Sequence, residues 1–182
     1  MTSHFVPAVR LTVALLSLAC GGYLTGLGQW WSLPFILVTL LLVWDYLRNG
    51  AVWSAFRAFR QGDMERMRRL LAQVRWPQRL SARSIAYYHW LRGVLDALDG
   101  RHGAARVHLL VAASGELSSE NDRALVQCLL AEVALQGGDR EAARQHLRLA
   151  RNLEHHERVS KLIRSLSGRV EGGDGSSPQT GE

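Results

Sequence analysis

Gly62-Asp63-Met64-Glu65 returns twice along the chain, as Gly100-Arg101-His102-Gly103 and as Gly138-Asp139-Arg140-Glu141. The leading glycines stand at positions 62, 100 and 138, which gives a repeat period of 38 residues. Two further sets of residues keep this register: Leu71, Leu109 and Leu147, and Ala55, Gly93 and Ala131. Even spacing of similar residues is typical of stacked helix–turn–helix units. Such units bind partners on extended surfaces, so the repeat favours an interaction module over an enzyme.

The period divides residues 51–167 into three units, at about 51–76, 85–114 and 123–153, and a capping helix at about 154–166. The predicted cap carries Val159, Leu162, Ile163 and Leu166 at helical spacing. Residues 168–182 are mostly glycine, serine, proline and acidic residues. Because such a composition buries little apolar surface, this segment is expected to be a disordered tail.

No charged residue occurs between Leu11 and Trp44. A bilayer core takes about 20 apolar residues per helix, so this run is too long for one span, and the stretch from Gly26 to Pro34 interrupts it. We therefore predict a transmembrane hairpin within residues 1–50, with helices at about 6–27 and 33–47. Gly22 and Gly26 form a small-xxx-small pair that favours close packing of the two helices. No strand is indicated, and the fold class is all-α.

Arginine determines the predicted orientation of this hairpin. Nine arginines lie between Arg48 and Arg83, against two acidic residues, Asp63 and Glu65. The positive-inside rule then places both termini in the cytoplasm. The basic neck of the chain, which we expect to face anionic lipid headgroups, consists of Arg48, Arg57, Arg60, Arg66, Arg68 and Arg69. An acidic protein or a nucleic acid is an alternative partner for these arginines, although Trp76 alone interleaves with them.

A second interpretation of the N-terminus remains open. Residues 1–20 also have the basic start and apolar run of a signal peptide, and Ser17–Gly21 has a distant likeness to a lipoprotein cleavage box. That interpretation leaves the second apolar stretch unexplained. The two cysteines, Cys20 and Cys128, lie in such different settings that they do not indicate a disulfide framework.

The small residues of the second unit, Gly93, Gly100, Ala105 and Ala112, and its large apolar Leu109 resemble the pattern of the tetratricopeptide repeat family. This resemblance covers residues 51–153 and implies pairs of antiparallel helices. The period departs from the family's usual value of about 34 residues, and an ordinary helical bundle with chance spacing is the alternative. The stretch from Asp45 to Asp63, with the order of hairpin, basic neck and repeats, is similar to the N-terminal part of the longer, HemY-type proteobacterial membrane family linked to haem biosynthesis.

In the tetratricopeptide family the first helix of each unit lines a concave groove. The resemblance implies that this groove consists of Val52, Phe56, Tyr87, Trp90, Val94, Leu125, Cys128 and Glu132. An apolar groove with one acid suits an amphipathic helix or an apolar extended segment. If Trp90 lines it, a Trp90→Ala variant should bind less well without unfolding. Alternatively, Tyr87 and Trp90 are buried against the neighbouring unit.

The sequence contains no recognisable catalytic or metal-binding spacing. His155 and His156 are adjacent, and adjacent residues on a helix do not face each other; no H-E-x-x-H or C-x-x-C motif occurs. We therefore expect no cofactor, no metal and no enzymatic activity. The sequence favours a membrane-anchored scaffold or assembly factor that recruits a protein partner. The alternative is an accessory subunit bound through its hairpin; the partner and the oligomeric state are not indicated.

Overall fold

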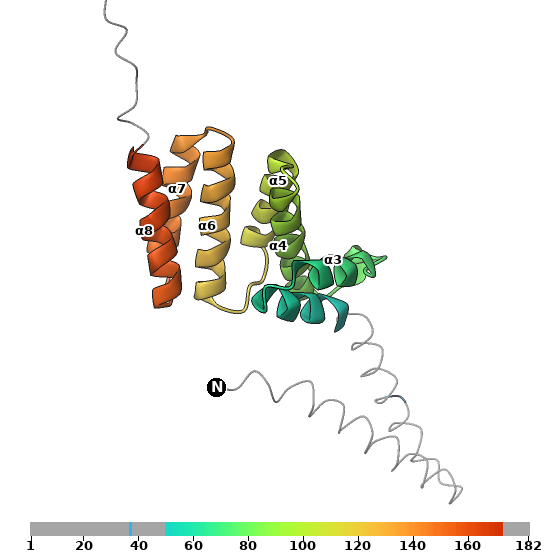
Figure 1. Ribbon diagram of the computed structural model, residues 1–182. Coiled ribbons are helices and arrows are strands. Elements are labelled where there is room, and N and C mark those ends of the chain that lie inside the picture. The colour runs from blue at the N-terminus through green and yellow to red at the C-terminus, as the bar shows by residue number, and fades with distance from the viewer. Residues whose placement is uncertain (1–36, 38–49, 173–182) are drawn as a thin grey trace, which may run out of the picture. The chain divides into compact units, whose positions relative to one another are not determined.

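The computed structural model describes Leu37 and residues 50–172. Within this part of the chain every regular element is a helix, so the predicted all-α class is confirmed there. Residues 50–60 are helical, and the elements after them are α3 (Met64–Ala72), the 3₁₀ turn η1 (Pro77–Arg79), α4 (Ala82–Leu98), α5 (His102–Ser114), α6 (Glu120–Gln136), α7 (Arg140–Arg151) and α8 (Glu157–Gly172). Figure 1 shows α4 to α8 as neighbouring helices.

None of the helices in the described residues is long and apolar enough to cross a membrane. The predicted hairpin, with Gly22 and Gly26, lies outside these residues apart from Leu37, and so do Arg48 and residues 173–182. The chain divides into two compact units, of which the second begins at Val52. The description below concerns this second unit.

Three turns with the same hydrogen bonds occur in this second compact unit, one in each repeat unit. At Gly62, Gly100 and Gly138 the backbone has φ angles of 80°, 75° and 78°, a left-handed conformation that glycine adopts without strain. Each glycine N–H donates to the carbonyl three residues back, and the next N–H donates to the carbonyl five residues back. This pair of bonds is the Schellman motif that ends a helix. The 38-residue spacing therefore marks three equivalent helix ends.

The helices after these turns begin in two ways. Asp63 and Asp139 cap α3 and α7, since their side chains accept hydrogen bonds from the backbone N–H groups of Arg66 and Ala142. The N-cap of α5 is Arg101, whose side chain makes no such bond. Its guanidinium instead donates to Asp96, at 2.6 Å, and to Asp99, at 2.8 Å. At the start of α5, the second repeat unit thus has an ion-pair network in place of a capping carboxylate.

Small residues allow the paired helices to approach closely. Three equivalent positions, occupied by Met67, Ala105 and Ala143, are fully buried. At Gly93 a Cβ would lie 2.7 Å from Leu109 Cγ, so α4 and α5 touch where glycine stands. Buried residues form two apolar cores, one from Val52 to Val133 and one from Ala124 to Val170, and Leu125 packs against both.

The prediction of the C-terminal tail is wrong for its first residues. The expected disordered segment began at residue 168, but α8 continues to Gly172. The reason is Val170, which lies one turn after Leu166 on the same side of the helix and is buried with it. Ser167 is also buried, and its hydroxyl donates to the Ile163 carbonyl and accepts from Arg151.

Candidate functional site

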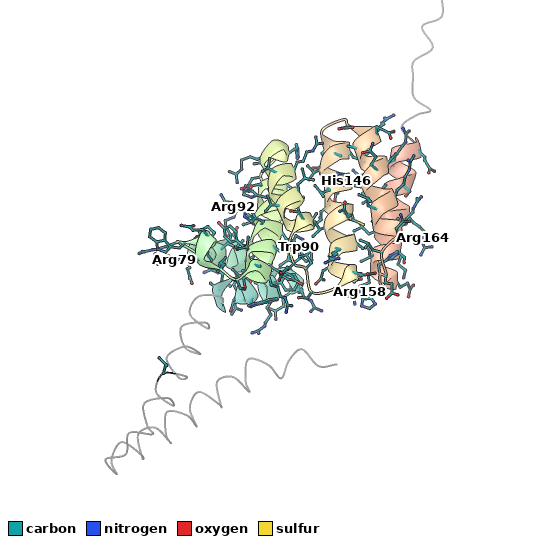
Figure 2. All side chains as sticks on the ribbon, turned by 180° about the vertical axis from the view of Figure 1, so that it is seen from behind. Arg79, Trp90, Arg92, His146, Arg158 and Arg164 are labelled. Carbon is teal, nitrogen blue, oxygen red and sulfur yellow. The ribbon has the colours of Figure 1, made fainter. Side chains whose placement is uncertain are left out.

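Four of the residues expected to line a partner groove lie in the apolar core. Val52, Tyr87, Trp90 and Cys128 are each at most 1% exposed, and Figure 2 shows Trp90 inside the helical stack. The prediction that these side chains contact a partner is therefore wrong, and the stated alternative of burial against the neighbouring unit describes Tyr87 and Trp90. The physical reason is the small size of the unit, which fills its core with its own aromatic rings.

The aromatic rings join the first repeat unit to the second repeat unit, both within the compact unit that begins at Val52. The ring centroid of Phe56, which is half-buried, lies 4.8 Å from that of Tyr87 and 5.3 Å from that of Trp90. Phe59 approaches Trp90 at 6.0 Å in an edge-to-face arrangement. These separations lie in the range in which aromatic pairs attract each other beyond simple burial. The cluster is therefore structural.

Tyr87 also connects α4 to the start of α6. Its hydroxyl donates to the carboxylate of Asp122 and accepts from the backbone N–H of Ser118 at 3.2 Å. Burial, assisted by the bond to Asp122, raises the pKa of Tyr87 to about 12. The phenol therefore remains protonated at neutral pH and holds neighbouring units together.

Cys128 has no features of a reactive thiol. Burial raises its pKa to about 11, and a thiolate is the form that attacks or binds metals. Leu125, on the same helix, is half-buried between the two cores. Burial therefore removes Cys128 from the surface at which the sequence predicted a partner.

Two of the predicted groove residues do meet in a groove. Val94 from α4 and Glu132 from α6 line one hollow of about 160 Å³. The remaining lining residues are Ala97, Leu98, Leu109, Leu129, Val133 and Gln136. We call this hollow the α4–α6 groove. Leu98 stands at its rim with 62% of its surface exposed, although the sequence analysis missed it. Its helical position four residues after Val94 was the available signal.

The only acid of the α4–α6 groove already has a partner in the described structure. Arg169 of α8 lies 3.5 Å from the Glu132 carboxylate, and both side chains are partly exposed. Exposed pairs of this kind contribute about 0–1 kcal/mol, so an incoming basic group of a partner can replace Arg169 at little cost.

A second hollow, of about 300 Å³, lies between the starts of α6 and α8 and is lined by Ser119, Glu120, Asn121, Glu154, His155 and His156. Internal bonds use its polar groups. The backbone N–H of Glu154 donates to Glu120, and that of His156 donates to Asn121, both at 2.9 Å. His155 Nδ1 donates to the Leu153 carbonyl. No group of three metal-binding side chains exists in the described residues, and we regard this hollow as a joint between helices.

The sequence analysis missed a buried polar chain between α4 and α5. Asp96 is 2% exposed; its Oδ2 lies 3.5 Å from His108 Nε2, and His108 Nδ1 lies 2.9 Å from His89 Nδ1. His108 thus lies between the Asp96 carboxylate and the His89 ring. The third unit has Gln127 and His146 at the equivalent positions, with the two side chains bonded at 2.8 Å. A histidine 19 residues after a polar residue was the sequence signal.

The predicted basic neck is only partly free. Arg57, Arg60, Arg66 and Arg69 are exposed, but Arg68 forms a two-pronged bond to Asp99, at 3.0 and 2.7 Å. This contact with Arg68 lowers the pKa of Asp99 and raises that of Arg68. In this structure the guanidinium of Arg68 ties α3 to the end of α4, and its predicted contact with lipid stays a prediction.

The outer face of α5 carries exposed apolar residues that the sequence pattern did not predict. Val107, Leu110 and Val111 are 60%, 43% and 39% exposed and lie on one side of the helix at i, i+3 and i+4 spacing. The equivalent residues of α7 are Gln145, Arg148 and Leu149. We call this surface the α5 outer face. Exposed apolar clusters on a helix are typical of interaction sites.

Comparison of the chain with protein-family models, with curated proteins and with solved structures found no match.

Proposed function

We propose that the chain is a membrane-anchored scaffold or assembly factor with tetratricopeptide-like repeats, which recruits a protein partner at the cytoplasmic face of a bacterial inner membrane. The support is physical. The uncharged run from Leu11 to Trp44 favours the anchor, and three equivalent Schellman turns favour repeated helix pairs. No catalytic arrangement is part of this proposal.

The α4–α6 groove is the observation that carries the recruiting role. Its volume of about 160 Å³ is below the roughly 300 Å³ at which small-molecule sites begin. A groove of this size holds one or two apolar side chains of a polypeptide. Leu98 offers an exposed apolar rim, and Glu132 offers a carboxylate. The expected partner segment is therefore an amphipathic helix or extended strand with an apolar anchor and a neighbouring lysine or arginine.

Photo-cross-linking from the groove rim tests this proposal. The photoreactive residue p-benzoylphenylalanine is introduced at Leu98 of the full chain in native membranes, and at Leu149 of α7 as the matched control, since both positions are exposed. We expect one dominant protein adduct from position 98 and none of the same mass from 149. The adduct should disappear with Leu129→Glu, which charges the groove, and persist with Leu149→Glu. Identical adducts from both positions, or insensitivity to Leu129→Glu, would exclude the groove as the binding site.

The α5 outer face favours a second function, an accessory subunit of a membrane enzyme complex. A subunit packs laterally against larger neighbours, and the exposed Val107, Leu110 and Val111 suit such a contact. In this case the hairpin also contributes, through the predicted pair Gly22 and Gly26. Replacing the hairpin with an unrelated one distinguishes the two functions. After this replacement, a scaffold that works through its groove retains its partner, whereas a subunit held by its hairpin is released from the complex. A Gly22→Leu/Gly26→Leu variant of such a subunit should be released in the same way.

A further inference from the structure

An exposed tryptophan projects from the turn between α3 and α4. This turn has the sequence Arg75-Trp76-Pro77-Gln78-Arg79, and Trp76 is 59% exposed. Figure 2 shows Arg79 at the tip of this turn, beyond the helical stack. A large apolar ring is thus presented at an edge of the unit.

Hydrogen bonds fix the backbone of the turn that carries this ring. The Trp76 carbonyl accepts from the N–H of Arg79 at 3.0 Å, and the Pro77 carbonyl accepts from the N–H of Leu80 at 3.1 Å. Leu80 is buried in the core and anchors the end of η1. The exposure of Trp76 is therefore built into the fold and does not depend on a loose loop.

Positive charge lies beside the ring, and further arginines are exposed on α3, on the turn and at the start of α4. The guanidinium carbon of Arg79 lies 5.4 Å from the centroid of the Trp76 ring, a cation–π distance. Arg66, Arg69, Arg75 and Arg83 are also exposed. Within the part of the chain that the structure describes, no ion pair involves any of these five arginines. Their charges are available to an anionic surface.

We propose that Trp76 and these arginines form a docking surface for an anionic lipid bilayer; the inference rests on the membrane location in the proposed function but not on the α4–α6 groove. Tryptophan rings settle at the headgroup level of bilayers, and arginine forks pair with lipid phosphates. The Trp76 ring enters the interface while the guanidiniums of Arg75 and Arg79 contact phosphates beside it. This contact would hold the repeats against the membrane at the turn between α3 and α4.

A single-stranded nucleic acid is the less favoured partner for this surface. Proteins that bind single strands stack successive bases on several aromatic side chains. Trp76 is the only exposed aromatic residue on this turn, and Arg79 already covers one side of its ring. The experiment below tests this alternative directly.

The test places p-benzoylphenylalanine at position 76 of the full chain in nanodiscs. The discs contain phosphatidylcholine alone or phosphatidylcholine and phosphatidylglycerol in a 7:3 ratio, and a 30-nucleotide single strand is added in parallel samples. Position 149 serves as the control. Lipid and nucleotide adducts are quantified by mass spectrometry, and co-elution with the discs reports insertion of the hairpin.

We expect lipid adducts at position 76 and none at position 149. The yield at position 76 should be at least about tenfold lower in discs without phosphatidylglycerol, or in an Arg69→Gln/Arg75→Gln/Arg79→Gln variant. An inserted chain without lipid adducts at position 76, or with adducts that do not depend on lipid charge, overturns the docking surface but not the membrane location. Nucleotide adducts in place of lipid adducts overturn it in favour of the alternative partner. A chain that does not enter the discs overturns both the docking surface and the membrane anchor.

Discussion

At the scale of single residues, two tryptophans of this chain have opposite roles. Trp90 is fully buried among the rings of Phe56, Phe59 and Tyr87, whereas Trp76 is mostly exposed. Removal of a buried large side chain costs the transfer free energy of its surface and leaves a cavity. The same change at an exposed position leaves no cavity.

We predict that Trp90→Ala lowers the free energy of unfolding by about 3–5 kcal/mol and that Trp76→Ala changes it by no more than about 0.5 kcal/mol. Urea unfolding of the full chain in detergent micelles, followed by circular dichroism at 222 nm, measures both. A stable Trp90→Ala protein that only loses its partner would restore the original groove assignment, which the burial of Trp90 contradicts.

The repeat glycines were predictable because only a few residue types tolerate a left-handed backbone, so helix ends are visible in the sequence. The burial of Trp90 could not be predicted in the same way. Helical spacing places Trp90 on the first helix of a repeat unit, but it does not say whether the side of the helix that carries Trp90 meets the next repeat unit or solvent. Val94 and Glu132 line the α4–α6 groove, and their contact with a partner stays a prediction. Both lie near the far ends of α4 and α6, where the aromatic cluster with Trp90 no longer fills the space.

At the scale of helices, α5 differs from α3 and α7, the equivalent helices of the other repeat units, in the side chains on its outer face. α3 and α7 carry charged residues on their outer sides, such as Arg69 and Arg148, while α5 has Val107 and Leu110 there. A helix that is apolar on most of its circumference is usually covered. The equivalent turns and caps make the three helices alike in their backbone, so the outer side chains alone distinguish α5.

An exchange between repeats tests what covers α5. The variant Val107→Gln/Leu110→Arg gives α5 the residues that α7 carries at the equivalent positions. Because both positions are exposed, the free energy of unfolding should change by no more than about 0.5 kcal/mol. If the α5 outer face binds a neighbouring subunit, the complex purified in mild detergent should become smaller by mass photometry.

The control for this exchange is Leu149→Arg on α7, which adds the same charge to a single exposed leucine. We expect no change in the size of the complex with this variant. An exchange variant with a complex of unchanged size would show that the α5 outer face is not an interface.

At the scale of the whole unit, helix pairs are joined by polar contacts that the 38-residue period does not encode. Tyr87 links α4 to Asp122 of α6, and Arg68 links α3 to Asp99. Arg68 recurs at the equivalent positions as Arg106 and Arg144, but its partner Asp99 is replaced by Gln61 and Gly137, and Tyr87 is replaced by Leu125. The sequence period therefore predicts the helix pairs but not the contacts that join successive pairs. The apolar end of α8 at Val170 escaped prediction for a similar reason, since its few apolar residues lie among glycine and charged residues.

Two histidines, His89 and His146, lie between paired helices, and we expect them to make the stability of the fold depend on pH. Burial, with His108 beside it, lowers the pKa of His89. Burial, with Arg106 nearby, lowers that of His146, and Asp139 opposes this shift. In the unfolded chain each histidine has a pKa of about 6.5. Between this value and the lower folded pKa, the unfolded state binds more protons than the folded state, so stability falls as the pH falls.

We predict that the free energy of unfolding of the full chain changes little from pH 7.5 to about pH 6.5, decreases as the pH falls further to 5.0, and decreases less in a His89→Gln/His146→Gln variant. Glutamine retains a hydrogen bond at each site, as Gln127 does opposite His146. Asp99, whose pKa is lowered by Arg68, loses its contribution only below its unfolded pKa of about 3.9, outside this range. Urea unfolding at each pH measures the slope, and His156→Gln, at an exposed position, is the control. Equal slopes in wild type and the double variant would show that these two histidines do not set the acid sensitivity of the stack.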